Sequence, residues 1–310
     1  MRFVTYVSPG SGEHRVGAHI GDNVHGLPDR YLVDLLGDDG ERLARAGERA
    51  RQAPLEVVPV DSVRLEAPIP RPPVIWDFAS FEQHLRASRE ALGQPWSDEW
   101  YDQPTFYFQN AAAIHGPHDH VAIPPGTGQW DYELEICAVV GREGSNLTPD
   151  EAEDHIAGYM LFCDWSARDI QAREKRLGAG AAKSKDSATT IGPALVTPDE
   201  LEPFRTGKGF DLRMTARVNG DLLSDGNLKE IHWSFGEMLS YASRGTRLLP
   251  GSIAGSGTVG SGCLLELILV HGGDRYRFLE PGDVVRLEVA RLGALELRVG
   301  ERTLEGRRPS

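Results

Sequence analysis

Cysteine is scarce in this sequence, and long apolar runs are missing altogether. The 310 residues include only three cysteines, Cys137, Cys163 and Cys263, which are far apart and each lie in an apolar run. An odd number of widely spaced cysteines does not predict a disulfide framework, and free cysteine is among the most buried residue types. We therefore predict that all three are small core residues.

Basic residues are also outnumbered, with 33 Lys and Arg against 46 Asp and Glu, for a net charge of -13. This balance disfavours a phosphate-backbone partner. No stretch approaches the roughly 18 apolar residues that span a bilayer. The first residues, MRFVTYVSPG, lack a charged region leading into an apolar run. We therefore expect a cytoplasmic protein that binds neither nucleic acid nor membrane.

The chain divides at a proline-dense segment, LEAPIPRPP, which begins at Leu65. Residues 1–65 combine short β-like pieces with a charged, Ala-rich helical stretch and are predicted to form a small α+β subdomain. The pattern of residues 66–310 predicts mainly strands, including the late apolar run LLELILVHG. It predicts fewer helices, such as FEQHLRASREAL and SARDIQAREKRLG. The prediction is a β-rich α+β fold without alternating βαβ units.

Two carboxylates stand two residues apart in the strand-like segment WDYELEICAVVG. Strand side chains alternate between faces, so Glu133 and Glu135 point the same way. Neighbouring like charges repel, and the apolar residues that follow would partly desolvate them. A divalent cation would remove both problems. An acidic strand edge exposed to solvent would need no cation, and spacing alone leaves both interpretations open.

A third acid, Asp164, ends an apolar strand in FCDWSARDIQ, just before the capping-box pattern from Ser166 to Asp169. That pattern predicts a helix with Ser166 as its N-cap. Arg168 and Gln171 would then lie on one helical face, so that a cation and an amide could face the cavity that holds Asp164. Alternatively, an Asp before a helix serves only the helix N-terminus.

The fourth acid, Asp77, follows a buried-looking strand in VIWDFASFEQHLRAS, with His84 seven residues later. With the other three acids it would make an all-carboxylate site, which favours Mg²⁺, Mn²⁺ or Ca²⁺ over a Cys/His zinc site. His84 would be left free for proton transfer. A histidine on a helix surface or in the core is the alternative.

Two further sequence patterns are typical of binding sites. GSGTVG, residues 255–260, fits the G-x-G-x-x-G pattern of dinucleotide-binding loops, but such a loop must open a helix, and we expect CLLELILV to form a strand. A nucleotide site is therefore not expected. The aromatic segment from Trp96 to Phe108 is typical of a binding surface, a lid or ordinary core, and the sequence does not decide between them.

Over about Pro70 to Leu297 the sequence resembles the fumarylacetoacetate hydrolase family. DYELEI resembles the family's paired-glutamate strand, and DWSARDIQ resembles its most characteristic motif. KDSATTIGP places Lys185 at the active-site lysine, with Lys183 as the alternative, and SGT places Thr258 in a turn that lines the site. LEL places Glu266 as partner of the catalytic histidine. The metal ligands that the resemblance implies are Asp77, Glu133, Glu135 and Asp164, and the substrate-facing residues are Arg168, Gln171, Tyr107 and Thr258.

Two positions depart from the family pattern. Ala79 stands where hydrolases of fumarylacetoacetate itself have a substrate-binding tyrosine. Ala87 stands where other branches have a glutamate that pairs with the histidine. The resemblance therefore implies a pair of His84 with Glu266, without indicating the substrate's side chain.

The resemblance implies a mixed β-sandwich roll, a homodimer and a bound Mg²⁺, or Mn²⁺ or Ca²⁺. The implied activity is hydrolysis of a C–C bond in a 1,3-diketo acid similar to fumarylacetoacetate or an acylpyruvate. His84 and Glu266 would activate water, the metal would stabilise the enolate, and Lys185, Arg168 and Gln171 would stabilise the developing charge. The alternatives are a 2-oxo acid decarboxylase, hydratase or isomerase, or a metal-dependent binding protein without catalysis.

Overall fold

The structure, a computed structural model, describes residues 1–303. The predicted second segment, 66–310, therefore ends in residues 304–310, which lie outside the described part. No helix among the described residues is long and apolar enough to cross a membrane.

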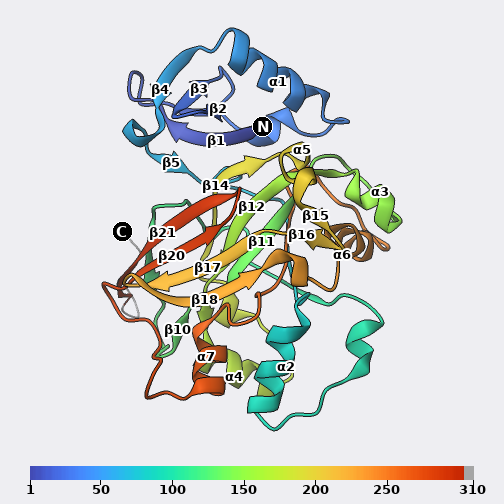
Figure 1. Cartoon of the computed structure of the whole chain (residues 1–310), viewed down its shortest axis with the longest axis vertical. Coiled ribbons are helices and arrows are strands. Elements are labelled where there is room, and N and C mark those ends of the chain that lie inside the picture. Colours follow the sequence, from blue (N-terminus) through green and yellow to red (C-terminus); the bar gives the residue numbers. More distant parts are fainter. Residues whose placement is uncertain (304–310) are drawn as a thin grey trace.

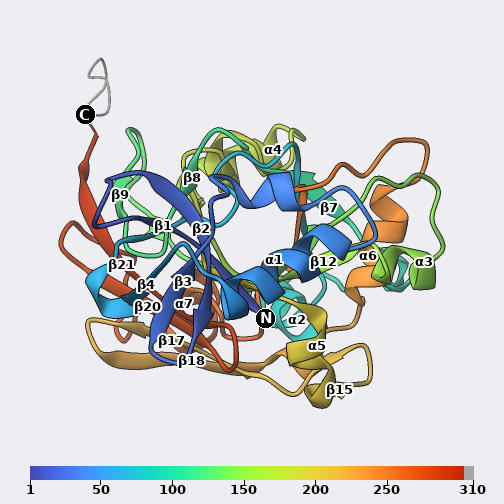
Figure 2. The same ribbon diagram turned by 90° about the horizontal axis from the view of Figure 1, so that it is seen from above.

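The N-terminal residues form antiparallel strands and one helix, shown in blue in Figure 1 and nearest the viewer in Figure 2. The predicted β-like pieces become β1 (Arg2–Val7), β2 (His14–Ile20) and β3 (Asn23–Gly26), and β4 (Glu56–Pro59) follows α1 (Glu41–Gln52). The helix turns Leu43, Ala46 and Ala50 inward. Its charged residues face solvent, as the amphipathic pattern predicts.

This N-terminal sheet continues into the rest of the chain. Strand β1 pairs with β14 (Thr189–Val196), with Arg2 opposite Val196, and with β5 (Leu65–Glu66). The main path runs β4-β3-β2-β1-β14-β12-β11-β19-β6-β7, and β8 (Ile114–His115) also pairs with β14. Its remaining strands are β12 (Ile156–Asp164), β11 (Leu134–Val140), β19 (Ile253–Gly255), β6 (Ile75–Phe78) and β7 (Phe106–Phe108).

A second sheet packs against the first. Its order is β18 (Asp221–Asn227), β17 (Arg213–Val218), β20 (Val284–Val289), β21 (Gly293–Arg302) and β9 (His120–Ile123). Ile136 and Ala138 of β11 share a core with Met214 and Leu287 of this sheet. Small two-stranded sheets are formed by β10 (Trp130–Asp131) with β13 (Ser166–Ala167) and by β15 (Arg205–Thr206) with β16 (Gly209–Phe210).

The other face of β11 packs toward the N-terminal part of the chain. Cys137 and Val139 share a second core with Phe3 and Leu43. The central strand is therefore buried on both faces, which explains why its sequence is almost continuously apolar. All three cysteines are free and buried, which confirms the core prediction. The fold is a strand-rich α+β fold with sheet packed on sheet, also as predicted.

The remaining helices are α2 (Glu82–Ala91), α3 (Pro149–Glu153), α4 (Arg168–Arg176), α5 (Pro198–Leu201), α6 (Phe235–Ala242) and α7 (Leu264–His271). Short 3₁₀ turns cover Leu32–Leu35, Val60–Ser62, Asp98–Tyr101, Lys183–Lys185, Glu202–Phe204 and Leu228–Glu230. Figure 1 shows α2, α4 and α7 gathered at the end of the molecule away from the N-terminal strands.

The strand prediction for LLELILVHG is wrong, because this run forms α7. The Cys263 side chain caps the helix by accepting from the Glu266 amide, and Asp131 accepts from the amides of Leu264 and Leu265. These partners satisfy donors that a helix N-terminus leaves free. Tertiary contacts thus override the strand preference of an apolar, partly β-branched run.

The predicted start of the helix that carries Arg168 is also wrong, by one residue. Ser166 and Ala167 pair with β10, so the helix α4 begins at Arg168. Its N-cap is Ala167, and no side chain caps it there. Ser166, which the capping-box pattern assigned to the helix N-cap, is therefore part of a strand pair instead.

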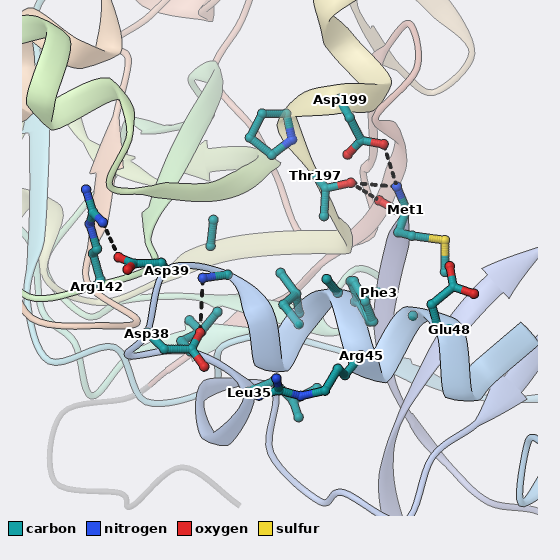
Figure 3. A pocket seen from close by; sticks show the side chains of 18 of the residues that line it. Met1, Phe3, Leu35, Asp38, Asp39, Arg45, Glu48, Arg142, Thr197 and Asp199 are labelled. Carbon is teal, nitrogen blue, oxygen red and sulfur yellow. Dashed lines mark hydrogen bonds and ion pairs between the residues drawn. The ribbon is translucent and has the colours of Figure 1, made fainter.

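A cavity of about 890 Å³ lies between α1 and the residues that follow β11 and β14 (Figure 3). At its rim the Met1 amino group lies 3.7 Å from Asp199, and Arg142 pairs with Asp39. None of the candidate site residues lines this cavity. It belongs to the junction of the N-terminal strands with the larger body.

Candidate active site

Four buried acids meet where neighbouring strands of the main sheet end. Asp77 lies on β6, Glu135 on β11 and Asp164 at the end of β12. Glu133 comes just before β11, and its backbone N–H donates a hydrogen bond of 3.0 Å to the carbonyl oxygen of Asp164. One carboxylate oxygen from each of the four lies within 4.8 Å of the others. The structure thus brings together all four acids singled out in the sequence.

Two buried cations contact this cluster. Lys185 Nζ lies 2.6 Å from Glu133 Oε2 and also contacts Asp164 Oδ2, while Arg168 Nη1 lies 2.7 Å from Glu133 Oε1. Although burial opposes it, these cations hold the pKa of Glu133 well below its usual range. Lys183, the alternative lysine, is exposed and pairs with Asp186 instead.

The other three acids are less fully compensated, because Lys185 contacts only Asp164 among them. Burial raises the pKa of Asp77, Glu135 and Asp164, with the neighbouring carboxylates adding to the effect. Asp77 Oδ1 and Asp164 Oδ1 are buried and have no hydrogen-bond partner among the described residues. A buried carboxylate oxygen without a partner is costly unless a cation binds it. The cluster could therefore hold a divalent cation, and its all-oxygen donor set suits Mg²⁺, Mn²⁺ or Ca²⁺.

Neighbouring donors orient the acids. The Tyr107 hydroxyl lies 2.7 Å from both Asp77 Oδ2 and Asp164 Oδ2, and Gln109 Nε2 donates to Asp77 Oδ2 at 2.6 Å. The Gly257 amide donates to Glu135 Oε2 at 2.8 Å. Such supporting bonds fix ligand side chains in place. Tyr107, proposed to contact substrate, thus also contacts two of the acids.

The turn at Gly257 requires glycine. Its φ is +77°, and a Cβ atom there would lie 2.3 Å from the Phe78 carbonyl oxygen. A helix, α7, follows residues 255–260, so the strand predicted after this glycine-rich segment is wrong. The turn nevertheless directs the Gly257 amide at a carboxylate, where a dinucleotide loop would direct its amides at phosphate.

The predicted partner residues His84 and Glu266 meet beside the cluster. His84 Nδ1 on α2 lies 2.6 Å from Glu266 Oε2 on α7, and Glu266 Oε1 accepts from the Ser261 amide at 2.9 Å. The His84 side chain is 16% exposed and that of Glu266 is 6% exposed. A carboxylate that accepts from Nδ1–H leaves Nε2 free as a base. Cys263, at the start of α7, pairs by its backbone with Glu133, which ties this helix to the acids.

The remaining predicted residues lie around these groups. Arg168 Nη1 donates to Gln171 Oε1 at 3.2 Å, and Thr258 Oγ1 lies 3.5 Å from Glu135 Oε1. In the aromatic segment, Trp100 donates from its indole nitrogen to the Ala79 carbonyl at 3.0 Å and packs against His232. This segment therefore packs at the position where the family's tyrosine is missing.

Sequence reasoning missed Asp131. Its Oδ2 lies 2.8 Å from Arg168 Nε and accepts from the Leu265 amide at 3.0 Å, and its Oδ1 accepts from the Leu264 amide at 2.8 Å. This one buried carboxylate thus positions both Arg168 and the start of α7. The available signal was its spacing, since Asp131 precedes Glu133 and Glu135 at the same two-residue interval.

Comparisons with known proteins point the same way. The family model described as fumarylacetoacetate (FAA) hydrolase C-terminal matches residues 73–300. A mitochondrial oxaloacetate tautomerase of Bos taurus is 28% identical over 95% of this chain and 90% of its own length.

Two solved structures share the fold. One, from Mycobacterium abscessus, is a probable 2-hydroxyhepta-2,4-diene-1,7-dioate isomerase, 27% identical, with a TM-score of 0.71 over 98% of this chain and 100% of its own. The other is maleylpyruvate hydrolase from Sphingobium in complex with manganese(II) and pyruvate, 22% identical, with a TM-score of 0.72 over 98% of this chain and 100% of its own. The family model matches most of the chain, and the structure brings the four acids together, so the chain belongs to the fumarylacetoacetate hydrolase family.

Proposed function

We propose that this protein is a metal-dependent hydrolase that cleaves a C–C bond in a 1,3-diketo acid similar to an acylpyruvate or fumarylacetoacetate. The observation that carries the proposal is the His84–Glu266 pair, 2.6 Å apart beside the four acids. Hydrolysis needs a base that activates water, and a histidine oriented by a carboxylate is suited to that task. Asp77, Glu133, Glu135 and Asp164 are the proposed metal ligands, with Mg²⁺ as the proposed ion.

A divalent cation held by the four acids would polarise the substrate's carbonyl oxygens and would stabilise the negative charge of the leaving group. His84 Nε2 takes a proton from water, and the resulting hydroxide attacks the distal carbonyl carbon. Glu266 stabilises the imidazolium that forms. As the C–C bond breaks, His84 returns its proton to the departing carbon, so that an acid and a methyl ketone or 2-oxo acid are released.

Charged and polar groups of the chain are placed to stabilise the developing negative charge. Lys185 and Arg168 bring two buried cations to the cluster, and Gln171 lies on the same helical face as Arg168. Donors fixed before the reaction stabilise a transition state without reorganising. Tyr107 and Thr258, which lie next to Asp77 and Glu135, are also proposed to contact the substrate.

A second candidate function is tautomerisation or isomerisation of a 2-oxo acid, because two similar proteins are described with activities of this kind. The Bos taurus relative is an oxaloacetate tautomerase, and the Mycobacterium abscessus structure is a probable isomerase. The same base could move a proton between carbon and oxygen without activating water. A homodimer is a further proposal from the family resemblance, and a cytoplasmic location is a further proposal from the N-terminal sequence. The Bos taurus relative is mitochondrial.

A substrate panel separates the two candidates. Acylpyruvates, fumarylacetoacetate and oxaloacetate would be incubated with the protein and Mg²⁺ or Mn²⁺, following diketone or enol absorbance and identifying products by NMR. The hydrolase proposal expects two carbon fragments from a diketo acid. Conversion of enol to keto oxaloacetate with no fragments formed would favour the second candidate, and no metal-dependent turnover of any compound would favour a binding protein.

The metal assignment predicts that Asp164→Asn weakens Mn²⁺ binding by about 10-fold to 100-fold or more, the range for losing supporting interactions at a metal site. The amide removes the negative charge and replaces one of the two Asp164 oxygens with an NH₂ group, which cannot bind a cation. Free Mn²⁺ measured by electron paramagnetic resonance gives the affinity. Asp169→Asn is the matched control, because Asp169 binds Thr127 and the Gly128 amide outside the cluster. Equal affinity in both variants would contradict the assignment.

A further inference from the structure

A sulfur atom lies against the proposed catalytic pair. His84, Cys263 and Glu266 each present one potential ligand atom, and these three atoms lie within 4.8 Å of one another. Two of the contacts are direct: His84 Nδ1 lies 2.6 Å from Glu266 Oε2, and the Glu266 amide donates to Cys263 Sγ at 3.5 Å. The trio differs from the four acids in its ligand atoms. It offers one nitrogen, one sulfur and one oxygen, whereas the four acids offer only oxygens.

The donor set suits a different class of cation. Thiolate and imidazole ligands favour Zn²⁺ and similar borderline ions, whereas all-carboxylate sites favour harder ions. Zinc bonds to sulfur, nitrogen and oxygen are about 2.0–2.3 Å long, so tetrahedral ligands lie roughly 3–4 Å apart. The three atoms of the trio lie within 4.8 Å of one another, which brackets this spacing, and the 2.6 Å contact of His84 with Glu266 would open as the ion enters.

The trio is held by rigid elements. Cys263 and Glu266 lie on the first turn of α7, and His84 lies on α2, which packs against it. Glu266 Oε1 accepts from the Ser261 amide. Its Oε2 could therefore bind an ion while Oε1 keeps that hydrogen bond. Cys263 is fully buried and His84 is partly exposed, so an ion would enter from the side of His84.

Carboxylates surround the start of α7. Glu266 lies on the same turn as Cys263, Asp131 accepts from two backbone amides of this turn, and Glu133 pairs with the Cys263 backbone. The guanidinium of Arg168 is already paired with Asp131 and Glu133. Binding would displace the thiol proton to solvent and form a metal–thiolate bond, with no change in oxidation state.

We propose that His84, Cys263 and Glu266 form a second metal site, specific for borderline divalent cations such as Zn²⁺ and Co²⁺, whose occupation blocks the catalytic base. The binding itself does not depend on which reaction the protein catalyses. Only the inhibition rests on the proposed function, because it requires His84 to be the base.

The binding test uses Co²⁺ as the probe and the full chain in excess Mg²⁺. A thiolate bound to Co²⁺ gives a near-ultraviolet charge-transfer band, which ions held by the four acids do not give. We expect the band in the unaltered protein, and about 10-fold or greater loss of Co²⁺ affinity with loss of the band in Cys263→Ser. Serine preserves the N-cap of α7, so the helix should remain in place.

The control is Cys137→Ala, which removes a buried cysteine that packs in the other core and should retain the band. Absence of the band in the unaltered protein would overturn the proposal, whatever happens to the variants. A band that survives in Cys263→Ser would overturn it as well.

The inhibition test adds Zn²⁺ during turnover in saturating Mg²⁺. We expect loss of activity that a chelator followed by Mg²⁺ reverses, and an inhibition constant at least about 10-fold higher in Cys263→Ser. Equal Zn²⁺ sensitivity of both proteins would show displacement of ion from the four acids and would overturn the inhibitory role. If no turnover is found, the Co²⁺ spectrum still decides the site, so its failure is distinguishable from failure of the proposed function.

Discussion

Replacing His84 with alanine is expected to lower kcat by roughly 10²–10⁴-fold, the usual loss when a general base is removed. The imidazole lies 2.6 Å from Glu266 and contacts none of the four acids by a hydrogen bond or ion pair. Mn²⁺ affinity should therefore change little. Steady-state kinetics on the best substrate of the panel, combined with Mn²⁺ titration, measures both quantities.

The matched control for this substitution is His271→Ala. His271 ends α7, the helix that carries Glu266, but it belongs to neither metal-ligand group. It should keep nearly full activity. Glu266→Gln should fall between the two, because glutamine still fills the space but cannot stabilise the imidazolium. A fully active His84→Ala protein would rule out the proposed role of the pair.

Replacing Asp131 with asparagine is expected to lower the free energy of unfolding by about 3–5 kcal/mol, the usual cost of removing one partner of a buried ion pair. Arg168 would keep Glu133 as a partner, so we expect the lower end of this range. The NH₂ group of asparagine would also face either the Leu264 amide or the Leu265 amide, because these bond to different oxygens of Asp131 and both are donors themselves. Urea denaturation followed by circular dichroism measures the loss.

Asp211→Asn provides the comparison for a pair at the surface. Asp211 lies 3.4 Å from Lys229 with both side chains exposed, and such pairs contribute about 0–1 kcal/mol. If Asp131→Asn were no more destabilising than Asp211→Asn, the buried pair would not support the fold. A large loss of activity in Asp131→Asn protein that remains folded would indicate that Asp131 positions α7 and Arg168.

The acids were accessible to sequence reasoning because their signals are local. Glu133 and Glu135 stand at the strand interval, and Asp164 ends an apolar run, so the alternation of the backbone already fixes their direction. Asp131 follows the same interval but was not singled out, since nothing local shows that its partners are Arg168 and the start of α7.

Helix α7 was missed for the same physical reason. An apolar run of eight residues, Leu264–His271, suits a strand or a helix equally well by periodicity. What selects the helix is the cap supplied by Cys263 and by Asp131, and Asp131 lies 133 residues before Leu264. Likewise, pairing of Ser166 with Asp131 in a two-stranded sheet delays the start of α4.

The sequence alone indicated the strand-rich class, the buried cysteines and the candidate acids, because these depend on composition, two-residue alternation and position next to apolar runs. It indicated the family through the resemblance of its motifs. The tertiary structure places His84 against Glu266 across 182 residues, as the resemblance implied. Only the tertiary structure decided that Lys185 rather than Lys183 reaches the acids and that Cys263 lies against the pair. Contacts between distant segments form when helices and sheets pack, and local sequence patterns contain no record of that packing.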